Sequence, residues 1–297
     1  MLSTDSSVAF SITTHNRRAD LARTLKAMQR LQPGPAEILI CADGCRDDTV
    51  EWVRKHHPEH RLLIHQEGRG SVFSRDQMLR ESRSEIVVCF DDDSYPIETD
   101  FVPRQQRLMD THPRLAVVSF PQRSDEYPDS LQQTEFGPSC YVGTYANSGA
   151  AYRRSIYLQL PGFPDYFFHA YEEPDYALQA WSSGFEVLNY TALLVRHRYS
   201  AAERSEIRTH QRHSRNELCS VWMRCPWPML IPMTLFRMVR QLGYAHERGW
   251  NWVVREPAWW LAGLRRLPLA WKRRLPVSSD AYWKWLKLLR QPPPIEV

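Results

Sequence analysis

Short apolar runs alternate with amphipathic segments over the first third of the chain. The apolar runs predict four strands, at residues 7–13, 37–43, 61–66 and 84–90. The segments between them place apolar residues at helical spacing and predict helices at residues 19–31, 47–57 and 71–82. Strands that alternate with helices of about 12 residues indicate βαβ units and a parallel sheet.

The pattern changes further along the chain. Residues 121–165 show little periodicity and are rich in Pro, Tyr, Ser and Gly, which predicts loops and part of a mixed sheet. From about residue 200 helical patterns dominate, interrupted by prolines. Residues 1–195 hold 19 Lys and Arg against 27 Asp and Glu, a net charge of −8, whereas residues 196–297 hold 19 against 7, a net charge of +12. Nine of the eleven tryptophans also lie in the second part, so two differently built regions share the chain.

Overall composition narrows the class of protein. With 43% hydrophobic and 24% charged residues, the 297-residue chain is typical of a folded globular protein and not of a disordered or collagen-like one. The first residues lack the basic and apolar segments of a secretory signal, and no run of about 18 apolar residues occurs. We therefore expect a cytoplasmic protein, with association at the inner face of the membrane left open.

Carboxylates follow two of the predicted strands. Asp43 ends the second strand, and Asp91, Asp92 and Asp93 follow the fourth. The carboxyl ends of parallel strands meet at one edge of a sheet, where ligands of such folds bind. Mg²⁺ or Mn²⁺ takes one or two carboxylates together with phosphate oxygens. The pattern indicates a divalent cation beside a diphosphate, although a solvated acidic turn that caps a helix has the same composition.

A second acidic cluster is the segment Glu172-Glu173-Pro174-Asp175. Proline suits the first turn of a helix, and carboxylates there are favoured by the helix dipole. That structural explanation stands beside a catalytic one, in which a glutamate whose pKa is tuned by its neighbours acts as a general base facing the metal site.

These segments occur in the order seen in a known family. Seven motifs carry the resemblance: residues 13–17 (TTHNR), 42–47 (ADGCRD), 70–76 (GSVFSRD), 91–93 (DDD), 172–175 (EEPD), 195–197 (VRH) and 215–216 (RN). With them the chain resembles the family 2 glycosyltransferases of the GT-A fold, particularly bacterial rhamnosyltransferase-like members.

The resemblance implies an α/β fold of the GT-A type, with a mostly parallel, Rossmann-like sheet flanked by helices and a helical C-terminal extension. It implies a nucleotide-sugar-binding and catalytic domain at residues 1–217 and a basic, Trp-rich helical region at residues 218–297. The implied reaction is metal-assisted, inverting transfer of a sugar from a UDP-, dTDP- or GDP-linked donor to a hydroxyl of a glycan or lipid-linked acceptor. Mn²⁺ or Mg²⁺ would be the cofactor, and the product a surface glycan or glycolipid.

The resemblance also assigns roles to individual residues. Nucleotide binding falls to Thr14, Arg17, Asp43, Arg75, Asp91 and Asp92. Asp93 would ligate the metal, with Asp91 and His197 as further ligands. Glu173 would deprotonate the acceptor, with Glu172 as its substitute and Asp175 in the same catalytic segment.

Three positions depart from the family pattern and leave alternatives open. Ala42 replaces the first aspartate of the nucleotide loop, Glu173 replaces the usual aspartate base, and Gly68 replaces an asparagine. A catalytically silent scaffold or binding protein with the same fold is therefore one alternative. A nucleotidyltransferase-type enzyme is another, but it would need a Gly- and Lys-rich phosphate loop, which residues 11–18 do not supply.

The C-terminal region also has more than one interpretation. It interleaves tryptophan, leucine and arginine as interfacial helices do, and anionic lipid headgroups attract such cations. A lipid-diphosphate acceptor would use the same chemistry. A helical cap that packs its tryptophans on the catalytic domain or on a second subunit is equally consistent with the sequence. Nucleic acid is not expected as a partner, because no recognisable binding module is present.

Overall fold

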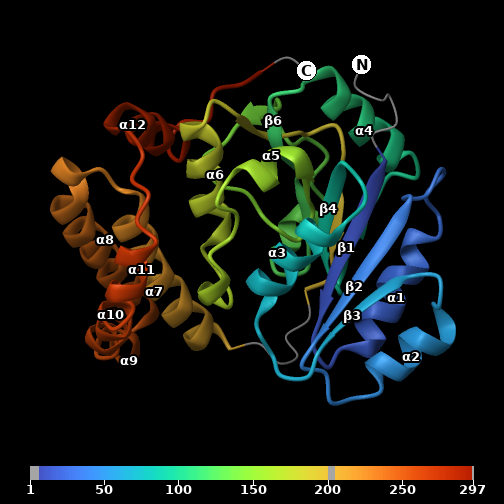
Figure 1. Ribbon diagram of the computed structural model, residues 1–297, viewed down its shortest axis with the longest axis horizontal. Coiled ribbons are helices and arrows are strands. Elements are labelled where there is room, and N and C mark those ends of the chain that lie inside the picture. Colours follow the sequence, from blue (N-terminus) through green and yellow to red (C-terminus); the bar gives the residue numbers. More distant parts are fainter. Residues whose placement is uncertain (1–6, 200–204, 296–297) are drawn as a thin grey trace.

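The computed structural model describes residues 7–199 and 205–295 (Figure 1). Its centre is an eight-stranded sheet in the order β3-β2-β1-β4-β9-β6-β10-β8. These strands are β1 (Val8–Thr14), β2 (Glu37–Asp43), β3 (Arg61–His65), β4 (Ile86–Asp91), β6 (Leu115–Ser119), β8 (Cys140–Tyr141), β9 (Ala150–Arg153) and β10 (Glu186–Asn189). Strands β1 to β4 are parallel to one another, whereas β9 is antiparallel to both of its neighbours.

Helices cover both faces of this sheet. They are α1 (Arg18–Met28), α2 (Thr49–His56), α3 (Ser71–Glu81), α4 (Phe101–Thr111), α5 (Arg154–Gln159) and α6 (Glu172–Ser182). Every residue of β1 is buried, and alternation sends its side chains to two core layers. Phe10 and Ile12 pack with α1, α2 and α4, and Ala9 packs in the layer that contains α3, α5 and α6.

The secondary structure predicted for the first third of the chain is confirmed. All four strands and three helices are present, with ends that differ by no more than three residues. The middle of the chain supplies loops and the antiparallel strand β9, as its pattern predicted. The α/β class and the mostly parallel central sheet are therefore established.

A second, three-stranded sheet lies at the carboxyl end of β4. It consists of β5 (Ser94–Pro96), β11 (Val195–His197) and β7 (Gln122–Ser124). Strand β11 runs antiparallel to β5, and their register places His197 opposite Ser94. This pairing brings a histidine distant in the sequence next to the aspartates that follow β4.

The C-terminal part is helical, as expected. It contains α7 (Glu206–Arg224), α8 (Trp227–Arg248), α9 (Trp250–Val253), α10 (Glu256–Leu264), α11 (Leu267–Lys272) and α12 (Ser279–Leu288). Figure 1 shows these helices beyond α6, on the side away from β1. Helix α7 is continuous through residue 217, where the sequence division was drawn. The division into two domains remains a prediction.

The end of the chain returns to the catalytic region. Trp285 on α12 is buried, and its indole Nε1 donates to the carbonyl of Gly143 at 2.8 Å. The amide of Tyr141 donates to the carbonyl of Pro293 at 3.1 Å. Part of the tryptophan-rich region therefore packs as a cap on the sheet domain. No helix in the described part of the chain is long and apolar enough to cross a membrane.

Candidate active site

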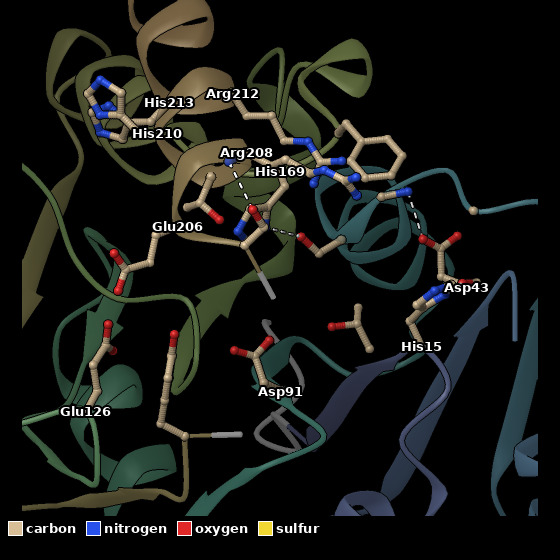
Figure 2. A pocket seen from close by; sticks show the side chains of 18 of the residues that line it. His15, Asp43, Asp91, Glu126, His169, Glu206, Arg208, His210, Arg212 and His213 are labelled. Carbon is tan, nitrogen blue, oxygen red and sulfur yellow. Dashed lines mark hydrogen bonds between the residues drawn. The ribbon is translucent and has the colours of Figure 1, made fainter. Parts of the chain in front are cut away.

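The carboxyl ends of β1, β2 and β4 open into a cavity of about 850 Å³ (Figure 2). Register explains this arrangement, because Thr13 lies beside Asp91 on β4 while Thr14 lies beside Ala42 on β2. Thr14, Asp43 and Asp91 therefore line one wall of the cavity, as strand order predicted for the two aspartates.

Asp91, Asp93 and His197 form a cluster that fits a divalent cation. One potential ligand atom from each of the three lies within 4.8 Å of the other two. His197 Nε2 is 3.3 Å from Asp93 Oδ1, and both side chains are buried. Among the described residues this ring nitrogen has no hydrogen-bond partner, which is costly for a buried polar atom. Two carboxylates and an imidazole are suitable ligands for Mn²⁺, and the structure assembles the three metal ligands that the resemblance implied.

The electrostatics of this cluster also favour a cation. Arg17 forms ion pairs with Asp93 and, at 3.1 Å, with Asp92. Burial raises the pKa of Asp92 to about 8, with Asp93 and Asp91 adding to the rise and Arg17 opposing it. Arg17 is thus held by the acidic cluster, and a divalent cation there would relieve the repulsion between the carboxylates.

Arg75 connects the two acidic clusters. It lies buried on α3, with Nη1 3.1 Å from Glu172 Oε1 and Nη2 paired with Asp91. Burial alone would lower its pKa, but Asp91 and Glu172 more than offset this and the pKa is raised. Arg75, to which the resemblance assigned nucleotide binding, therefore links the cluster of Asp91, Asp93 and His197 to the segment that begins at Glu172.

The two glutamates occupy different environments. Glu172 is buried, pairs with Arg75 and accepts a hydrogen bond from Asn147 Nδ2 at 3.2 Å. Glu173 is half-buried, and burial together with the neighbouring charge of Glu172 raises its pKa to about 8. A carboxylate with a raised pKa and no ion pair among the described residues is the better proton acceptor of the two.

Asp175 lies apart from this machinery. It is fully buried and accepts hydrogen bonds from Ser220 Oγ at 2.7 Å and Gln179 Nε2 at 2.7 Å. Its carboxylate also pairs with Arg224 at 3.3 Å. These contacts join α6 to α7 and give Asp175 a packing environment; like Glu172 and Glu173, it is not among the residues that line the cavity.

Asp43 fixes the loop before α3 at the wall of the cavity. Its carboxylate accepts hydrogen bonds from the amides of Arg69 at 2.8 Å and Gly70 at 2.7 Å, and lies 2.8 Å from His65 Nδ1. Gly70 has a φ of +91°, and a Cβ there would approach the carbonyl oxygen of Phe168 to 2.1 Å. The loop before α3 is thereby pressed against the loop before α6.

Several cavity residues carried no prediction of a site role. His15 and His169 line the wall, with His169 Nδ1 3.0 Å from Ser71 Oγ. Arg208 and Arg212 reach the cavity from α7. The sequence held two signals for these residues. His169 lies shortly before Glu172, and Arg208 and Arg212 are spaced by one helical turn, which places them on the same face of a helix.

Comparison with solved structures shows the same fold. GalNAc-T7 in complex with UDP, GalNAc and Mn²⁺ aligns with a TM-score of 0.60 at 11% identity, covering 75% of this chain and 48% of that enzyme, so the chain spans about half its length. The mannosyltransferase PcManGT from Pyrobaculum calidifontis, in complex with GDP-Man and Mn²⁺, aligns with a TM-score of 0.57 at 18% identity and coverages of 88% and 87%. S. aureus TarS 1-349 with UDP-GlcNAc aligns with a TM-score of 0.58 at 14% identity, covering 95% of this chain and 81% of that one.

Sequence comparison gives the family. No curated protein sequence matches the chain significantly. The family model described as glycosyl transferase family 2, in contrast, matches residues 10–174. The matched segment runs from β1 past Asp91 and Asp93 to the start of α6, and it ends before His197. Since it covers more than half of the chain, this protein belongs to glycosyltransferase family 2.

Proposed function

We propose that this protein is an inverting glycosyltransferase that takes a sugar from a UDP-, dTDP- or GDP-linked donor with the help of Mn²⁺ or Mg²⁺. The observation that carries the proposal is the continuous chain of contacts from the Asp91, Asp93 and His197 cluster through Arg75 to Glu172, next to Glu173. The donors and Mn²⁺ bound in the GalNAc-T7 and PcManGT structures support it.

The donor would occupy the wall formed by the strand ends. Thr14, His15 and Asp43 lie where they can contact the nucleoside, and Arg17 holds the second and third aspartates in place. When bound at Asp91, Asp93 and His197, the cation would neutralise the diphosphate and stabilise it as a leaving group. Arg75 would then lie between the donor site and the two glutamates, because it pairs with Asp91 and with Glu172.

Glu173 would act on the acceptor. Glu172 is already committed to Arg75 and Asn147, which leaves Glu173 to accept the proton of the attacking hydroxyl. The acceptor oxygen then bonds to the anomeric carbon as the bond from that carbon to the phosphate oxygen breaks, and the nucleoside diphosphate leaves. A single displacement of this kind inverts the anomeric centre. Asp175, held between α6 and α7, would support this segment and take no part in proton transfer.

The acceptor is a hydroxyl of a glycan or lipid-linked molecule in this proposal, with peripheral contact between α8 and the inner face of the membrane. Four apolar side chains at every fourth position of α8 face solvent: Trp227, Ile231, Leu235 and Val239 are 64%, 69%, 58% and 69% exposed. A stripe of that kind on a basic region suits an anionic lipid surface. The cavity-lining residues Gln241, Tyr244 and Arg248 lie on another face of α8, so such contact would leave the cavity open.

Nucleoside diphosphate release tests the proposal. The wild type is incubated with UDP-, dTDP- and GDP-sugars and Mn²⁺, and one donor class is expected to be turned over. D93N should abolish release because it removes a metal-binding carboxylate, and E173Q should keep nucleotide affinity while it loses transfer. Equal release by the wild type and D93N would contradict the proposed site.

A further inference from the structure

The cavity extends beyond the donor wall and reaches the C-terminal helices. Residues of α7 and α8 line this second end, including Arg208, Arg212, Arg240 and Arg248. Figure 2 shows Arg208 and Arg212 on the side of the cavity opposite Asp91. The end at the strand termini thus carries Asp43, Asp91 and Asp92, and the helical end carries the four arginines together with Glu206 and Glu217.

The four arginines are not equivalent. Arg240 pairs with the buried Glu217, and Arg248 lies 3.6 Å from Glu206. Arg208 and Arg212, by contrast, have no carboxylate at ion-pair distance within the described ranges. The Arg212 guanidinium instead packs over the ring of Phe168, 4.3 Å from its centroid.

This pair of cations is unfavourable for the helix that carries it. Like charges four residues apart repel one another, and cations near a helix N-terminus oppose the macrodipole. Arg208 lies in the first turn of α7, and Arg212 follows it by four residues. Burial and the charge of Arg208 lower the pKa of Arg212, so an anion between the two would stabilise both. The two arginines therefore do not stabilise α7 by themselves, and their arrangement favours the binding of an anionic ligand.

The position of Arg212 points to the acceptor. Phe168, on which it packs, belongs to the loop that leads directly into Glu172 and Glu173. Phe168 lines the cavity four residues before Glu172, so the end of the cavity that Arg212 reaches is the one beside the loop of the proposed base. Guanidinium groups form paired, charge-assisted hydrogen bonds with phosphate oxygens. Tyr244 and Trp252 line the same wall further along and pack against His210.

We infer that Arg208 and Arg212 bind a phosphate group of the acceptor, so that the acceptor is a phosphate-bearing molecule. The inference rests on the proposed function and deepens it by giving the acceptor a chemical class. Such a phosphate belongs either to a lipid-linked carrier or to a water-soluble phosphorylated glycan. Both sources offer the same chemistry to the two arginines.

Calorimetry with inorganic pyrophosphate and farnesyl diphosphate in EDTA tests the inference, because the chelator removes metal-dependent binding. The wild type should bind pyrophosphate, and R208Q/R212Q should bind it about tenfold more weakly or worse. The matched control R255Q/R265Q removes two exposed cations of the same region that do not line the cavity, and should bind as the wild type does. Tighter binding of farnesyl diphosphate than of pyrophosphate would indicate a lipid-linked acceptor, and equal binding a soluble one.

Nucleotide binding with Mn²⁺, measured on the same proteins, separates this inference from the proposed function. R208Q/R212Q should retain the nucleotide affinity of the wild type. If R208Q/R212Q also lost nucleotide affinity, the two arginines would bind the donor diphosphate, and this result would overturn the acceptor assignment. Failure of the wild type to bind pyrophosphate, or equal binding by the double variant, would also overturn it. Absence of nucleotide binding in the wild type would instead refute the proposed function.

Discussion

Asn216 is expected to hold the catalytic loop in its active shape. Its side chain is fully buried on α7, and Nδ2 lies 3.1, 2.9 and 2.8 Å from the carbonyl oxygens of Phe167, His169 and Ala170. This loop contains three non-glycine residues with left-handed backbone, Phe168, Ala170 and Tyr171, at φ of 67°, 69° and 72°. Glu172 and Glu173 follow immediately.

The magnitude follows from these contacts. One NH₂ group has two hydrogens for three carbonyls, and the carbonyl of Phe167 also accepts from Arg215 Nη2 and from the amide of His169. N216A therefore removes the donor from two buried acceptors, the carbonyls of His169 and Ala170, at about 1–3 kcal/mol each, and should destabilise the fold by about 2–6 kcal/mol. Three left-handed residues store roughly 1 kcal/mol or more each, which is comparable to what Asn216 contributes. Without the amide, the loop is expected to relax toward ordinary backbone angles and shift the N-terminus of α6.

Urea unfolding and steady-state kinetics measure the two consequences separately. N216A should lower the free energy of unfolding and, in the folded protein, lower kcat by about 100-fold, since a displacement near 1 Å at a catalytic group costs that much. Nucleotide affinity should stay unchanged, because the donor wall lies on other elements. N216D, which keeps the shape but cannot donate, should behave like N216A, and N251A at an exposed position serves as the control. Loss of stability with an unchanged kcat would refute a positioning role.

Three further predictions address Glu173, the exposed apolar stripe of α8 and a loop contact. Because the pKa of Glu173 is raised to about 8, kcat should rise with pH through that value. The free energy of unfolding should fall between about pH 5 and pH 8, because over this range the folded state still holds a proton that the unfolded state has already lost. Substituting both Ile231 and Val239 by Glu should abolish co-sedimentation with vesicles rich in phosphatidylglycerol, since it places two charges on the exposed apolar stripe. G70A should destabilise the fold by about 2 kcal/mol or more in urea, because φ is +91° and the added Cβ meets the carbonyl of Phe168.

Each of these three predictions has a matched control variant and an outcome that would contradict it. For Glu173, E173Q should reduce the fall in the free energy of unfolding with pH and leave the part that the raised pKa of Asp92 contributes, whereas an unchanged fall would show that Glu173 is not the titrating group. For the helix, L158E adds a charge at an exposed leucine of the catalytic region, and equal sedimentation of both mutants would exclude the α8 stripe. For the loop, G34A is the control, because a Cβ at Gly34 meets nothing within 4 Å. Equal stability of G70A and G34A would contradict the close contact.

The sequence was most informative where local pattern determines structure. Strand alternation located β1 to β4 closely, and strand order alone placed Asp43 and Asp91 at one edge of the sheet. The metal cluster required the resemblance as well, because His197 reaches Asp93 only through the pairing of β11 with β5. Periodicity does not reveal which distant strands pair.

Tertiary contacts account for what the sequence did not show. The two carboxylates held by Arg75 come from β4 and α6, and no local signal links these elements. Asp175 shares a motif with Glu173, but the turn of α6 directs it toward Arg224. The arginine-lined end of the cavity arises because α7 and α8 fold back over the loop before α6. Such placements depend on packing between regions far apart in the chain.

Calorimetric titration with UDP, dTDP and GDP, each with Mn²⁺ and again with EDTA, tests the central claim most directly. The account predicts that one nucleotide binds in a metal-dependent manner, and that D93N loses at least about tenfold in affinity with Mn²⁺ but not with EDTA. Binding that is unaffected by EDTA and by D93N, or no binding of any of the three nucleotides, would contradict a metal-assisted donor site at Asp91, Asp93 and His197.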